Sequence, residues 1–112
     1  MKINIEDYKE NDIEIKNAVI NIYFDDNELL IDYDFYTDKN SYMGHEILAS
    51  NDKFFVKAWG KEYSLDYFLD LSDEVIIQKA KDEFRKKARE RIEEEKYYIK
   101  LKSLEKRFKK ED

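Results

Sequence analysis

Residues 18–36, with the sequence AVINIYFDDNELLIDYDFY, alternate apolar and polar side chains on either side of a turn-forming segment. The apolar face of the first arm consists of Ala18, Ile20, Ile22 and Phe24, and that of the second arm consists of Leu29, Ile31, Tyr33 and Phe35. Such alternation is typical of a β-strand with one buried face. Residues 25–28 (DDNE) predict a hairpin loop, because Asp and Asn tolerate turn conformations. We therefore expect two antiparallel strands with an apolar inner face and an acidic outer face.

Further short strands are predicted on both sides of this hairpin. The alternating pairs that precede it are Ile3 with Ile5 and Ile13 with Ile15. The change of phase between Ile15 and Ala18 predicts a bulge or bend near residues 16–17. After the hairpin we expect a loop over 38–44, a second hairpin formed by 46–50 and 53–59 across Asn51 and Asp52, a turn at 60–61 and a short continuation at 62–63.

The apolar period changes from two to about four at residue 72. Ser72 is a suitable N-cap, and the acidic residues Asp73 and Glu74 suit the positive end of a helix. A single helical turn capped by Ser64 is expected just before it. The residues expected to pack the long helix on the sheet are Ile76, Ile77, Ala80, Phe84, Ala88 and Ile92.

These elements predict an α+β fold in which an antiparallel sheet of about five strands is followed by a long C-terminal helix. A chain of 112 residues is the size of one domain. We expect a single domain over 1–112, made of a β-sheet body over 1–63, a short helical turn over 64–71 and a long helix over 72–110.

The length of the predicted helix leaves two arrangements open. At about 1.5 Å per residue it is roughly 57 Å long, whereas a compact domain of this size is about 35 Å across. The helix either projects beyond the body or breaks near Glu95 and folds back. Residues 96–104 also alternate at Tyr97, Ile99 and Leu101, which allows a strand, although a helix is favoured because no turn residue precedes them.

The composition excludes several classes of function. The chain has no cysteine and one histidine, His45, which excludes thiolate chemistry and histidine-rich metal sites. Its only glycines, Gly44 and Gly60, cannot form a phosphate-binding loop. There is no apolar run of about 18 residues, and we expect residues 1–7 not to be a signal peptide. We expect a cytoplasmic protein without membrane contact, cofactor, bound metal or enzymatic activity.

The acidic half of the chain supplies the first candidate site. Residues 1–72 carry a net charge of −9, whereas residues 73–112 carry +3. The partner-binding residues expected on and around the hairpin are Asp25, Asp26, Glu28, Asp32, Asp34, Tyr36 and Asp38. Carboxylates interleaved with tyrosines suit a surface that covers the basic groove of a protein partner, such as a nucleic-acid enzyme. The same acids also occur on an ordinary solvated sheet face.

In general character the chain resembles the small acidic single-domain inhibitors made by phages and mobile elements, such as anti-CRISPR proteins, several of which mimic nucleic acid. The resemblance rests on size, on the acids named above, and on the absence of cysteine, proline and catalytic motifs. It implies a non-enzymatic inhibitor that occupies a nucleic-acid-binding surface of a bacterial defence protein such as a CRISPR effector. No functional residue is carried over from it.

The helical half supplies two alternative functions. Arg85, Lys86 and Arg89 belong to a basic cluster that could lie on phosphates, although an isoelectric point near 5.0 disfavours direct nucleic-acid binding. In the other alternative, helices of two copies pair to form a homodimer. The residues expected to make that contact are Tyr97, Leu101, Leu104 and Phe108, which we expect to extend the apolar face of the helix.

Overall fold

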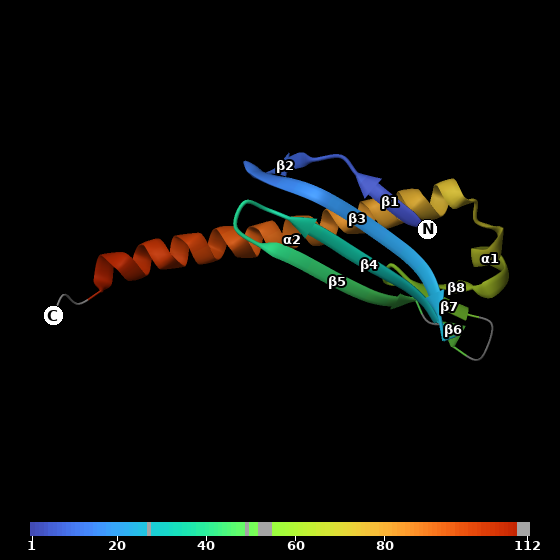
Figure 1. Ribbon diagram of the computed structural model, residues 1–112. Helices are drawn as coiled ribbons and strands as arrows, with labels where there is room; N and C mark the ends of the chain where they lie inside the picture. The colour runs from blue at the N-terminus through green and yellow to red at the C-terminus, as the bar shows by residue number, and fades with distance from the viewer. Residues whose placement is uncertain (27, 49, 52–54, 110–112) are drawn as a thin grey trace.

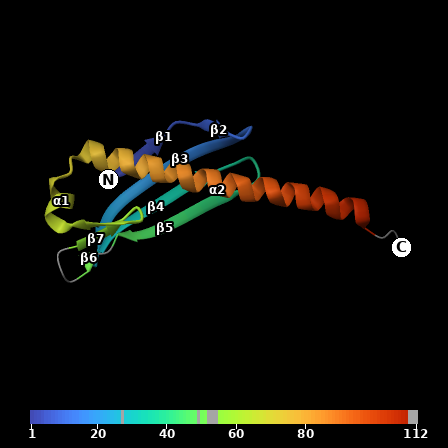
Figure 2. The same cartoon turned by 180° about the vertical axis from the view of Figure 1, so that it is seen from behind.

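In the computed structural model, which describes residues 1–26, 28–48, 50–51 and 55–109, the first half of the chain forms an antiparallel sheet. Its strands are β1 (Lys2–Ile5), β2 (Tyr8–Glu10), β3 (Ile13–Asp25), β4 (Glu28–Tyr36) and β5 (Ser41–Leu48). The hydrogen-bonded order is β1-β3-β4-β5, and β2 pairs with the first part of β3. A long helix, α2 (Asp73–Phe108), lies across one face of this sheet (Figure 2). The predicted α+β fold is confirmed.

The hairpin of β3 and β4 has the register that the alternation predicts. Ile20 lies opposite Tyr33 and Ile22 lies opposite Ile31, and all four side chains are buried. At the turn, Asp26 adopts a left-handed conformation with a φ of 50°, which Asp tolerates better than most residues. Asn27, also predicted to be in this loop, lies outside the described residues.

The predicted bulge is present where the alternation changes phase. The register of β3 against β4 shifts between Lys16 and Val19, and Asn17 has a φ of 53°. The Asn17 backbone N–H donates a hydrogen bond of 3.1 Å to the Asp7 carboxylate. Because of the extra residue, Ile15 and Ala18 can both be buried in the same core, although they are three positions apart.

The strand after the hairpin is longer than predicted. The loop expected over 38–44 is confined to 38–40, and β5 pairs with β4 from Ser41 opposite Tyr36 to Leu48 opposite Leu29. Residues 46–48 therefore belong to the main sheet and not to a second hairpin. The prediction was wrong because Gly44 and Glu46 occupy inward positions of β5, where an apolar side chain would have revealed the alternation.

A small second sheet follows, made of β6 (Ser50–Asn51), β7 (Phe55–Ala58) and β8 (Lys61–Ser64). β6 pairs with β7, as the second predicted hairpin requires, while Asp52 and Lys53 lie outside the described residues. The next turn is formed by Trp59 and Gly60, whose φ angles of 51° and 76° are both left-handed. The turn predicted at 60–61 is thus one residue too late.

Both helices begin at the predicted caps. The Ser64 hydroxyl accepts a hydrogen bond of 3.1 Å from the Tyr67 N–H at the start of α1 (Leu65–Asp70). The Ser72 hydroxyl accepts one of 3.3 Å from the Val75 N–H at the start of α2. Since α2 continues without a break to Phe108, the strand alternative for 96–104 is wrong. The predicted end at Lys110 lies outside the described residues.

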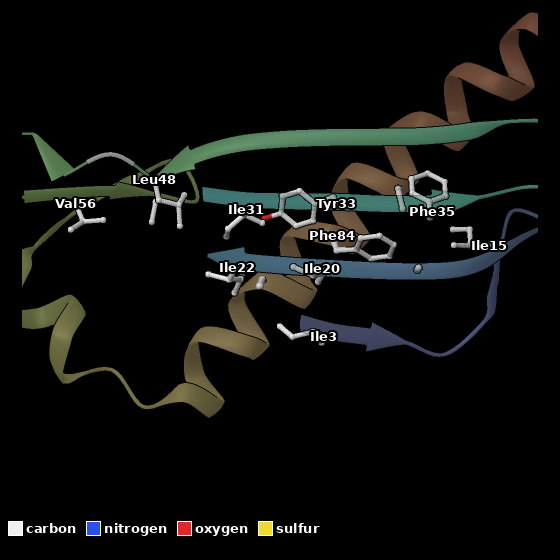
Figure 3. Close-up of a cluster of buried hydrophobic side chains, with 14 of the residues drawn as sticks. Ile3, Ile15, Ile20, Ile22, Ile31, Tyr33, Phe35, Leu48, Val56 and Phe84 are labelled. Atoms are coloured by element: carbon white, nitrogen blue, oxygen red, sulfur yellow. The ribbon is translucent and has the colours of Figure 1, made fainter. Parts of the chain in front are cut away.

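The core lies between α2 and the inner face of the main sheet. Ala80, Phe84, Ala88 and Ile92 are buried at four-residue intervals, as predicted, and Ile76 and Ile77 pack at the edge of the same cluster. The Phe84 ring lies among the side chains of the two central strands (Figure 3). It packs edge-on against Phe35 and is stacked near Tyr33, with centroid distances of 5.8 and 6.4 Å.

The helix is longer than the sheet that it covers. Its C-terminal part extends past the end of the sheet, while α1 and the small sheet lie at the opposite end (Figure 1). The described chain measures 65 × 29 × 21 Å, with a radius of gyration of 18.2 Å, whereas a compact domain of this size has one near 13 Å. Of the two predicted arrangements, the helix takes the projecting one.

Candidate protein-binding surface

A buried carboxylate marks the place where α2 leaves the sheet. Glu95 is 7% exposed, and it accepts a hydrogen bond of 2.5 Å from the Tyr42 hydroxyl. The Thr37 hydroxyl lies 3.4 Å from the same carboxylate, and it also accepts hydrogen bonds from the backbone N–H groups of Lys39 and Asn40 in the β4–β5 turn. Burial, together with the bond to Glu95, raises the pKa of Tyr42 to about 12. This cluster fixes α2 to the end of the sheet.

Beyond Glu95, four apolar residues lie on the other side of the helix, whereas Tyr98 and Ile99 stay on the side of the buried face. We call residues 96–108 the projecting segment, and its residues Tyr97, Leu101, Leu104 and Phe108 the apolar stripe. At about 100° per residue, the stripe lies roughly 120–180° around the helix from Ile92, the last buried apolar residue. The prediction that the stripe continues the buried face of α2 is therefore wrong. The stripe points away from that face.

The apolar stripe is open to solvent. Tyr97, Leu101, Leu104 and Phe108 are 61%, 43%, 50% and 75% exposed. Scattered exposed apolar residues are normal on a protein, but four on one side of a projecting helix form a contiguous surface. The rest of the segment carries five basic residues and one acidic residue, a net charge of +4. A partner for this segment needs apolar side chains surrounded by negative charge.

The structure separates the seven predicted partner-binding residues into three places. Asp25, Asp26 and Glu28 are exposed together at the tip of the β3–β4 hairpin. Asp38 lies at the opposite end of β4, more than eight residues of extended strand away, or roughly 26 Å. Its carboxylate accepts a hydrogen bond of 3.0 Å from Lys16 Nζ. The fold therefore does not bring the seven residues together into one continuous acidic surface.

The remaining three residues lie on the outer face of the sheet, away from α2. Asp32 lies opposite His45 in the register, with 2.5 Å between its Oδ1 and His45 Nδ1. Asp34 and Tyr36 border a shallow depression of about 340 Å³ that also contains Lys2 and Asn21. This face is thus mixed in charge, and its one histidine serves as a polar partner of an acid.

The basic cluster predicted on α2 is divided among ion pairs. Arg89 Nε lies 3.3 Å from a Glu10 oxygen on β2, and the neighbouring Lys87 and Arg91 pair with acids one turn away on α2 itself. Arg85 and Lys86 are exposed and point to different sides of the helix. Among the described residues, Arg85 and Lys86 are the members of this cluster without an ion pair, and none of the five bases of the projecting segment forms one.

Comparisons with protein-family models, curated proteins and solved structures found no match. The site must therefore be judged on its own geometry. Within the described ranges, no group of three or more His, Cys, Asp or Glu side chains is arranged to hold a metal ion. Neither helix among the described residues has the length and apolarity needed to span a membrane.

Glu95 is not among the residues predicted from the sequence, although the sequence contains a signal for it. Glu95 follows Ile92 by three residues and Ala88 by seven, which places it on the buried face of α2. It was overlooked because it ends the run Glu93–Glu95, which has the composition of a solvated face. The partner hydroxyls on Thr37 and Tyr42 carry no such signal, since they come from a turn and a strand more than fifty residues away.

Proposed function

We propose that this chain is a non-enzymatic assembly protein that binds other copies of itself through the projecting segment. The observation that carries this proposal is the apolar stripe, held away from the body on a helix that is fixed at Glu95. Burying such side chains stabilises a complex by about 25 cal/mol per Å² of apolar area removed from water. Without a partner a large part of each of these side chains stays exposed to solvent.

The experiment compares the chain with its Leu101→Glu, Leu104→Glu variant by light scattering over a range of protein concentrations. Both substitutions fall on exposed positions, so the body is expected to fold unchanged. We expect oligomers for the unaltered chain and monomers for the variant. Lys102→Gln with Lys106→Gln, on another side of the same segment, lowers the net charge by the same two units and is the control for the effect of charge alone. Equal oligomerisation of the stripe variant would contradict the proposal.

A second proposal is the acidic inhibitor that the sequence suggested, acting on a basic nucleic-acid groove of a defence enzyme such as a CRISPR effector. The observation in its favour is the exposed group Asp25, Asp26 and Glu28 at the hairpin tip. Within the described residues, none of the three forms an ion pair. Such a surface attracts Lys and Arg side chains of a partner.

Its test measures nucleic-acid cleavage by a purified CRISPR effector in the presence of the chain. We expect inhibition that declines with added salt and is lost in Asp25→Asn with Asp26→Asn. Asp32→Asn with Asp34→Asn, on the outer sheet face, is the control and should retain inhibition. Cleavage that proceeds unchanged at every concentration of the chain would rule out this target.

A further inference from the structure

The end of the molecule opposite the projecting segment contains an apolar cleft. The cleft has a volume of about 500 Å³ and lies where the β3–β4 hairpin, the β7–β8 turn, α1 and the start of α2 meet. Its lining includes Leu29, Trp59, Phe68 and Ile76. Phe24 and Met1, also in the lining, are 69% and 48% exposed, so the cleft reaches the surface. We call this end of the molecule the head.

Two of the segments that form the head are rich in acids, although Lys57 and Lys61 flank the β7–β8 turn and the N-terminal ammonium group of Met1 lies at the cleft. Residues 22–29 and 62–78 contain no Lys or Arg. Asp25, Asp26 and Glu28 are exposed at the hairpin tip, and four more exposed acids lie on α1 and in the first turn of α2. None of these seven acids takes part in an ion pair among the residues that the structure describes.

The head and the projecting segment are complementary in two independent respects. The head offers an apolar cleft with exposed acids near it, and the projecting segment offers an apolar stripe with the bases Lys100 and Arg107 along one edge. Lys100 and Arg107 lie three or four residues from Leu104, so they are its neighbours on the helix surface. Their charges would face the acids of the head if the stripe entered the cleft.

The two surfaces cannot meet within one molecule. They lie at opposite ends of the fold (Figure 1), and the uninterrupted helix between them holds them apart. Contact is possible only between copies. Two copies that lie antiparallel could each place a projecting segment on the head of the other, and a repeated contact in one direction would form a longer assembly.

Pairing of two projecting segments with each other is disfavoured by charge. Each carries +4 over about 20 Å of helix, and side-by-side contact would bring like charges within a Debye length. Nucleic acid fits less well than a second copy, because phosphates offer nothing to the apolar stripe. In addition, residues 1–95 carry a net charge of −10, which phosphates repel.

We infer that the projecting segment of one copy docks its apolar stripe into the head cleft of a second copy, with Lys100 and Arg107 facing the head acids. This inference rests on the proposed function and names the surface that the projecting segment binds. It requires two different surfaces for one contact, and this asymmetry can be tested by mixing variants.

The experiment uses two full-length variants, each altered in one surface. The tail variant carries Leu101→Glu and Leu104→Glu, and the head variant carries Asp25→Lys and Glu28→Lys, at exposed positions. Glu6→Lys with Glu90→Lys, which changes the charge equally at exposed positions outside the head segments, is the matched control. Masses are measured by sedimentation velocity at low and at physiological salt.

We expect each variant alone to be monomeric and the control to oligomerise like the unaltered chain. An equimolar mixture of the two variants should form a one-to-one heterodimer, because one intact head meets one intact projecting segment. Circular dichroism and thermal unfolding of the two variants confirm that monomers are folded. Loss of the heterodimer when Phe24→Glu is added to the tail variant would assign the contact to the cleft.

The remaining outcomes separate the two proposals. Oligomers of the head variant together with monomers of the tail variant would overturn head docking but leave the projecting segment as the binding element. Oligomers of the tail variant would overturn both proposals. Monomers of the unaltered chain at all concentrations would also overturn both proposals. In that case, binding of the chain to duplex DNA or to anionic vesicles would identify the alternative partner, provided that the tail variant no longer binds.

Discussion

The two parts of α2 make the same backbone structure for different reasons. Residues 73–95 bury Ala80, Phe84, Ala88 and Ile92 against the sheet, whereas residues 96–108 bury none of their apolar stripe. A short isolated helix is marginal in water because its first turn is costly to form. The projecting segment avoids that cost, since it only extends a helix that the packed part has already nucleated. Helical structure in α2 is therefore no evidence of burial.

The polar residues of the two parts differ in the same way. Residues 73–95 have eight acids and seven bases, and several pair with each other or with the sheet. Residues 96–108 have five bases and one acid, so most of their charge has no counterpart on the same helix. Charge in the packed part is balanced locally, whereas the projecting segment keeps a net charge of +4.

The largest expected difference between the two parts is in how much the free energy of unfolding falls when an apolar side chain is removed. Phe84→Ala should destabilise the monomer by about 3–5 kcal/mol, because it leaves a cavity beside Tyr33 and Phe35. Leu104→Ala should change stability by less than about 0.5 kcal/mol. Urea unfolding at low protein concentration measures both without a contribution from self-association. A similar cost for the two would show that the projecting segment packs on the body.

A smaller effect is expected at the boundary between the two parts. Glu95→Ala removes the acceptor of the Tyr42 and Thr37 hydroxyls and should cost about 1–3 kcal/mol. Glu94→Ala is the matched control, since Glu94 is exposed and its ion pair with Arg91 at 3.6 Å contributes at most about 1 kcal/mol. Urea unfolding of both variants measures the difference. If Glu94→Ala lowered the free energy of unfolding as much as Glu95→Ala does, the hydrogen bonds of Glu95 with Tyr42 and Thr37 would not fix α2 at this point.

Much of the fold could be predicted because local signals agreed with the tertiary structure. The hairpin of β3 and β4, the bulge near Asn17 and the cap at Ser72 each follow from a pattern within a few residues. β5 was shortened in the prediction because Gly44 and Glu46 interrupt its alternation. What makes β5 a strand is its pairing with β4, which no short stretch of sequence contains.

The candidate site was less predictable, since it depends on where the sheet ends. The apolar stripe was named from the sequence, but its rotation away from Ile92 follows from the five-residue step to Tyr97, which the prediction treated as a continuation. The head combines Phe24, Trp59, Phe68 and Ile76 from four separate elements. Only the assembled fold shows that acids near both Asp25 and Asp70 lie at one end.

The smallest expected effect is a pH dependence at the Tyr42–Glu95 bond. The pKa of Tyr42 is raised from 10.0 to about 12 in the folded chain, so the folded state holds this proton more tightly than the unfolded state. The stabilisation is therefore complete below about pH 10 and declines as the pH rises towards 12. Tyr42→Phe lacks the ionisable group, so its stability relative to the unaltered chain should improve over that interval.

Burial also raises the pKa of Tyr33 and Tyr8, but both residues remain in the variant and cancel in the comparison. Urea unfolding of both proteins at several pH values measures the difference, and a difference that does not change with pH would mean that Tyr42 and Glu95 do not hold α2 to the sheet as described.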